Sequence, residues 1–241
     1  MATVAFARRD PLEAERRFFF GMAIAIGATV VLGFGSHALL GRVDLGRATW
    51  LVHLHGATFM GWVALFVAQS WLVASGDVAT HRRLGMLSAA YAVFVVWMGL
   101  AIMMSSYRRG TVPPFFPPNV FLFMNVGHLL TFGGLTAAAV AMRRDAGWHK
   151  RLMLCGMLVL TGPAVGRLLP MPLLGRWNLH AVFAVLMLYA LVALVRDLRT
   201  RGSVHPAYRW GLGVFAAVQL LIEPLAWSGP GLAATRAVTG Y

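Results

Sequence analysis

The chain has 241 residues, of which 59% are apolar and 12% are charged, and its formal net charge is +13. A soluble domain carries roughly 45–50% apolar and about 25% charged residues, and disordered chains are rich in polar residues. The composition therefore excludes both classes and indicates an integral membrane protein. The charge does not indicate a nucleic-acid partner, because the arginines lie in small groups between long apolar runs. The single cysteine, Cys155, excludes a disulfide framework and a thiolate metal cluster.

Seven apolar runs are long enough to cross a bilayer as helices, some of them only with interfacial residues added, since a core of about 30 Å requires roughly 20 residues. In chain order they lie near residues 18–40, 51–75, 84–106, 119–142, 149–169, 178–195 and 210–227. The predicted fold is all-α, a polytopic membrane helical bundle with a single transmembrane domain over 18–227. Residues 1–17 are expected to form a cytoplasmic arm, and 228–241 an outer interfacial tail.

Basic residues outside these runs are unevenly divided between the two sides of the membrane. Fourteen lysines and arginines fall on the side of the N-terminus and six on the other side. Because positive residues favour the cytoplasmic side, we expect the N-terminus in the cytoplasm and the C-terminus outside.

Each of the second to fifth runs contributes one histidine to a repeated pattern: His55, His81, His128 and His149. The segments HRRLGML, from residue 81, and HKRLMLCGML, from residue 149, are alike and suggest a weak internal repeat. In a bundle of these helices, His55 and His128 would meet in the outer half, and His81 and His149 at the cytoplasmic boundary. Two imidazoles from facing helices can ligate a haem iron, so the pattern predicts one or two b-type haems.

This order of histidines resembles that of the cytochrome b561-type transmembrane haem proteins. The resemblance covers about residues 51–169 and implies axial ligands paired as second run with fourth and third with fifth. Basic residues beside the inner histidines would neutralise haem propionates or attract an anionic donor: Arg82, Arg83, Lys150 and Arg151. The chain departs from that family in having seven runs where six are usual. Its inner histidines also stand at the very start of their runs, so the outer pair is expected to be the better buried site.

The segments LHG-x-x-F-x-x-W, HRRLG and HKRLM also resemble those of uncharacterised bacterial multi-span membrane proteins. This resemblance implies a location in the bacterial inner membrane. The same histidines have simpler explanations that stay open. The basic segments could hold lipid phosphates, and His55 and His128 could be hydrogen-bonded groups that lock helix packing.

A second set of polar residues is expected near the outer face. There it could line a pocket for a quinone, a metal ion or a small substrate. The set includes the only acid and the only arginine within the predicted spans, Glu223 and Arg167, which could pair. Its members are His37, His53, Asn125, Arg167, Asn178, His180 and Glu223.

The leading functional prediction is a b-type haem protein that transfers electrons across or within the membrane. It would act as an oxidoreductase or an electron-transfer subunit, with an electron donor and an acceptor as partners. Two alternatives belong to other classes: a non-catalytic accessory or assembly subunit of a larger membrane complex, and a small-molecule permease.

Overall fold

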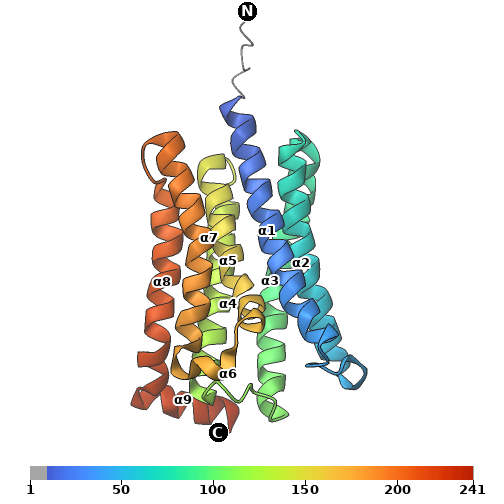
Figure 1. Cartoon of the computed structure of the whole chain (residues 1–241), viewed down its shortest axis with the longest axis vertical. Helices are drawn as coiled ribbons and strands as arrows, with labels where there is room; N and C mark the ends of the chain where they lie inside the picture. Colours follow the sequence, from blue (N-terminus) through green and yellow to red (C-terminus); the bar gives the residue numbers. More distant parts are fainter. Residues whose placement is uncertain (1–9, 241) are drawn as a thin grey trace, which may run out of the picture.

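A computed structural model of the chain describes residues 10–240, and every regular element within that range is a helix (Figure 1). Seven of the helices are long and apolar enough to cross a membrane, which confirms the predicted all-α membrane bundle. The elements are α1 (Pro11–Leu39), α2 (Trp50–Ala74), α3 (Val78–Arg108), α4 (Pro118–Ala141), α5 (Ala146–Leu168), α6 (Met171–Leu174), α7 (Asn178–Arg201), α8 (Pro206–Trp227) and α9 (Gly229–Thr239). Two short 3-10 turns, Leu45–Arg47 and Gly175–Trp177, interrupt the connections.

Several helices extend beyond the predicted runs, and the caps of α1 and α7 explain two of these extensions. α1 begins at Pro11, where proline suits the first helical turn, and the Asp10 carboxylate accepts a hydrogen bond from the backbone N–H of Leu12 at 3.0 Å. α7 continues to Arg201 and ends at Gly202, which adopts a left-handed conformation with φ 73°. The predicted arm is therefore helical from Pro11 onward, and residues 1–9 of it lie outside the described residues. Glu223 is not the only acid within a span, because Glu15 and Asp197 lie inside α1 and α7.

The first five helices form a ring. Each of α1 to α4 packs against the next helix, and α5 packs back against α1. α7 lies outside the ring against α5, and α8 lies against α4 and α5. The closing contact depends on Gly33, because a Cβ atom there would lie 2.4 Å from the carbonyl oxygen of Ala164. A glycine without a side chain therefore lets α1 and α5 approach closely.

The two ends of the bundle differ in the number of basic residues that they carry. The end with the start of α1 and the α2–α3, α4–α5 and α7–α8 connections is here called the basic end, because it carries Arg82, Arg83, Arg143, Arg144, Arg199, Arg201 and Arg209. The other end, called the opposite end, holds the remaining connections, with α9 running across the helix ends (Figure 1). α1 and α5 both run from the basic end to the opposite end.

Side chains from every helix of the ring meet in one apolar core. Trp62 of α2 and Phe132 of α4 contact each other edge to face, with ring centroids 5.3 Å apart. α5 is the central helix, and its Leu154, Cys155 and Leu158 are almost fully buried. The functional residues described next therefore lie at the two ends of a well-filled interior.

Candidate functional site

His81 of α3 and His149 of α5 face each other near the basic end. Their ring centroids are 6.1 Å apart, with the planes inclined at 77°. The Nδ1 atom of His149 lies 2.8 Å from the carbonyl oxygen of Ala139, at the end of α4. A carbonyl can only accept, so this contact places the proton on Nδ1 and leaves Nε2 with a free lone pair. This is the usual arrangement of a metal-ligating histidine.

The His81 ring is also contacted through Nδ1, by Gln69 of α2. In the orientation that satisfies both amide atoms, Gln69 donates to Nδ1 of His81 at 2.6 Å and accepts from Ser88 at 3.2 Å. With the amide turned over, its nitrogen donates to Ser88 at 3.2 Å instead, and its oxygen faces Nδ1. The first orientation puts the proton of His81 on Nε2, and the second leaves Nε2 with a free lone pair. Both rings are held through Nδ1 by neighbours on α2 and α4.

The residues present fit a haem better than a bare metal ion. Two imidazoles on opposite sides of one metal, each with a nitrogen about 2 Å from it, have centroids about 6 Å apart, which matches the His81–His149 spacing. Within residues 10–240 no group of three or more His, Cys, Asp or Glu side chains could hold an ion. A metal here would need its remaining ligands from outside these residue types, and a macrocycle would supply them. Two hollows in the described surface are lined by neither histidine.

The predicted outer pair has different neighbours. Nε2 of His128 lies 3.2 Å from the side-chain oxygen of Gln219 on α8, and its ring stands edge-on to Phe215. The His55 ring packs on Phe59, with centroids 4.4 Å apart, and its Nδ1 is buried without a hydrogen-bond partner. His128 therefore points to a helix outside the ring. A haem ligated by both residues would require His128 to leave Gln219.

The cations predicted to neutralise haem propionates fall into two groups. Arg82 and Arg83 are exposed beside His81. Arg151 is completely buried, and Lys150 is half-buried and forms an ion pair with Glu15 at 2.6 Å. Only Arg82 and Arg83 are therefore free to meet an anionic group beside the histidines.

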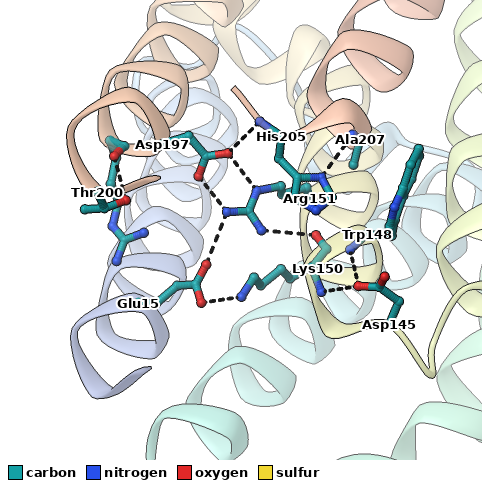
Figure 2. A network of polar contacts seen from close by, with 11 residues as sticks. Glu15, Asp145, Trp148, Lys150, Arg151, Asp197, Thr200, His205 and Ala207 are labelled. Carbon is teal, nitrogen blue, oxygen red and sulfur yellow. Dashed lines mark hydrogen bonds and ion pairs between the residues drawn. The ribbon is translucent and has the colours of Figure 1, made fainter. Parts of the chain in front are cut away.

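Arg151 is the centre of a closed charge network (Figure 2). Its Nε and Nη2 donate to the two carboxylate oxygens of Asp197 at 2.9 and 2.6 Å, and Nη2 also donates to Glu15 at 3.2 Å. The guanidinium lies near the rings of Phe19 and Tyr208. The network joins α1, α5 and α7, and two carboxylates compensate the buried charge.

His205, in the α7–α8 connection, extends this network to α8. Its backbone N–H donates to Asp197 at 3.1 Å, and its Nδ1 accepts from the backbone N–H of Ala207 at 3.1 Å, which caps α8 (Figure 2). Burial is the main cause that lowers the pKa of His205, and the charges of Arg151 and Arg201 lower it further. The neutral ring is therefore favoured, as the cap requires.

The predicted outer pocket is only partly assembled. Asn125 donates to the carbonyl oxygen of Phe121 on its own helix, and Asn178 donates to that of Phe115 at 2.8 Å. His180 packs against the neighbouring Trp177, and its Nδ1 is buried without a partner. His53 is exposed. These side chains have separate neighbours, so the described contacts do not join them into one pocket.

The expected Glu223–Arg167 pair is absent from the ion pairs of residues 10–240. Arg167 instead lies over the Phe34 ring, 4.0 Å from its centroid, and donates to the carbonyl oxygen of Pro163 at 2.9 Å. Its charge acts on both His37 and His55. Arg167 lies near the end of α5, at the same end of the bundle as His37 of α1 and His55 of α2.

Among the polar residues of these clusters, Glu15, Gln69, Asp197 and Gln219 were not singled out from the sequence. The predicted spans stopped short of both acids, so neither was recognised as an intramembrane charge. Gln219 carried a usable signal, because an amide inside an apolar helix needs a hydrogen-bond partner from another helix. It finds two, His128 and the carbonyl oxygen of Leu179 at 3.4 Å.

Comparisons with protein-family models, with curated proteins and with solved structures found no match to this chain. The family is therefore not assigned, and the contacts above are the basis for function.

Proposed function

We propose that the chain is a b-type haem protein of the membrane that transfers electrons, with His81 and His149 as axial ligands of one haem near the basic end. The spacing of their ring centroids, 6.1 Å, is the observation that carries the proposal. The geometry thus favours the inner pair over the outer pair, although the inner pair is the shallower one along the sequence. The second haem, between His55 and His128, has less support because Gln219 occupies Nε2 of His128.

When bound, the haem would supply a one-electron redox centre. The protein's part is to hold the two rings: Ala139 keeps Nε2 of His149 available, and Nε2 of His81 becomes available when the Gln69 amide is turned so that its oxygen accepts from Nδ1. Arg82 and Arg83 would offset the negative charge of the propionates on the side where both are exposed. With the predicted orientation, the haem would face a cytoplasmic donor in a bacterial inner membrane.

The test is the visible spectrum of the detergent-purified chain from a haem-replete host, oxidised and then reduced with dithionite. We expect a b-type Soret and α band that is lost in His81→Ala and in His149→Ala. His53→Ala is the matched control, because His53 is an exposed histidine on α2, and it should keep the bands. His128→Ala separates the two pairs, since it leaves an inner haem in place.

Two results would contradict the proposal. A colourless wild-type protein would exclude haem binding and favour the accessory-subunit alternative. Full haem retention in both inner variants, with loss in His128→Ala, would move the ligands to the outer pair.

A further inference from the structure

The opposite end of the bundle brings together three nitrogen-bearing side chains from α1, α2 and α5. α1 and α5 touch where Gly33 meets Ala164. One helical turn farther along each of these parallel helices lie His37 and Arg167, on the same faces as the contact. α2 begins at this end and carries His55 within its first two turns. All three side chains therefore lie toward the same end of neighbouring helices.

This cluster contains a cation without a carboxylate. Arg167 is half-buried, and its described contacts are the Phe34 ring at 4.0 Å and the carbonyl oxygen of Pro163 at 2.9 Å. A guanidinium has five N–H donors, so the Pro163 bond leaves most of them available. A charged group in a membrane span is costly unless it is paired or reaches water. Arg167 is therefore suited to an anion from outside the chain.

The two histidines add donors to the same place. Nδ1 of His37 and Nδ1 of His55 are both buried and have no hydrogen-bond partner in the described structure. A neutral imidazole can carry its proton on Nδ1 and donate it. Two imidazole donors beside a guanidinium fork are complementary to an oxyanion with several acceptor oxygens.

We propose that Arg167, His37 and His55 bind a phosphate group at the opposite end of the bundle. The guanidinium fork matches two phosphate oxygens, and the Phe34 ring beneath it fixes the plane of the fork. The cluster lies toward the end of three membrane helices, at the level where lipid headgroups are expected. The source of the phosphate is a phospholipid headgroup or free phosphate. The site does not depend on the haem proposal, because neither inner histidine takes part in it.

The experiment uses the full chain, delipidated in a non-ionic detergent, with binding measured by calorimetry. Dioctanoyl phosphatidylglycerol and inorganic phosphate are the two probes, and dioctanoylglycerol is the control without phosphate. We expect phosphate-dependent binding that Arg167→Gln weakens about tenfold or more, because a charge-assisted bidentate contact is lost. Arg236→Gln, which removes an exposed arginine at the same end, should leave the affinity unchanged.

The probes distinguish the two sources. Tighter binding of the lipid than of inorganic phosphate identifies a headgroup site, and equal binding identifies a site for free phosphate. Because Arg167→Gln could disturb packing, His37→Gln is a second variant that keeps the cation, and we expect it to weaken binding severalfold. Unchanged affinity in both variants, or binding of neither probe by the wild type, would overturn the proposal.

Discussion

Helix α5 carries an arginine near each end, and the two have opposite surroundings. Arg151 at the basic end is fully buried, and Asp197 and Glu15 compensate its charge. Arg167 at the opposite end is half-buried and has an aromatic ring and a backbone carbonyl as its described neighbours. A guanidinium whose partners all come from the chain stabilises helix packing, whereas one with spare donors can take an external ligand. The comparison therefore assigns a structural role to Arg151 and supports the binding role proposed for Arg167.

The largest expected effect comes from breaking the Arg151 network at the basic end with Asp197→Ala. This change leaves Arg151 buried without its bidentate partner, which costs about 3–5 kcal/mol. Thermal unfolding in detergent measures it. Asp44→Ala is the matched control, since it removes the acid of the exposed Arg47–Asp44 pair, and it should cost less than about 1 kcal/mol. Equal losses in the two variants would mean that the Arg151 network does not stabilise the bundle.

Gly33→Ala changes the contact between α1 and α5 toward the opposite end. Its Cβ would lie 2.4 Å from the carbonyl oxygen of Ala164, so α1 and α5 must separate, at a cost of about 1–3 kcal/mol. The separation should also weaken phosphate binding at Arg167. Gly35→Ala, whose Cβ meets nothing within 4 Å, should be neutral or slightly stabilising, because alanine favours a helix. Unfolding and calorimetry on both variants measure these effects, and a stable Gly33→Ala protein with normal phosphate binding would contradict the close approach.

Gln219→Leu tests whether His128 is a packing group of α8. The change leaves Nε2 of His128 buried without its partner, which costs about 1–3 kcal/mol. A double-mutant cycle with His128→Ala should show a coupling energy of about 0.5 kcal/mol or more in unfolding. Strict additivity of the two changes would show that the two side chains do not interact, and would free His128 for another role.

The smallest expected effect is a pH dependence at the basic end. The folded pKa of His205 is lowered by burial and by the charges of Arg151 and Arg201, so the unfolded chain binds the proton more readily. The free energy of unfolding should therefore fall as the pH drops below the ordinary histidine value of about 6.5. Unfolding between pH 8 and pH 5 measures it. His205→Asn keeps a residue that caps helices well and should lose this part of the pH dependence; an unchanged pH dependence would assign it to another group.

The helices themselves could be predicted because each bilayer crossing needs a continuous apolar run, and the seven runs leave little choice of class. The neighbours of each side chain could not. In lipid, residues facing the core and residues facing the acyl chains are equally apolar. Leu129 is 6% exposed and Leu130 is 65% exposed, although the two are identical and adjacent in the sequence.

Only part of the candidate site could be predicted from the sequence. The repeated basic segments placed His81 and His149 at one membrane boundary, and the structure brings their rings together. Arg151 follows the same pattern as Arg83, yet it is buried whereas Arg83 is exposed. The difference depends on Asp197 and Glu15, which belong to distant helices. Such a pairing across the sequence leaves no trace in local spacing.

The closure of the helix ring between α1 and α5 bears on how the protein is made. Domains assemble from the N-terminus as synthesis proceeds, so α1 to α4 reach the membrane before α5. Until α5 arrives the helix ring is incomplete, because α5 carries both His149 and Ala164, the residue that Gly33 contacts. A flat macrocycle could enter sideways from the bilayer during this interval, and the arrival of α5 would enclose it. Loading of the proposed haem would then be a step of biosynthesis, and the finished protein would exchange it only slowly.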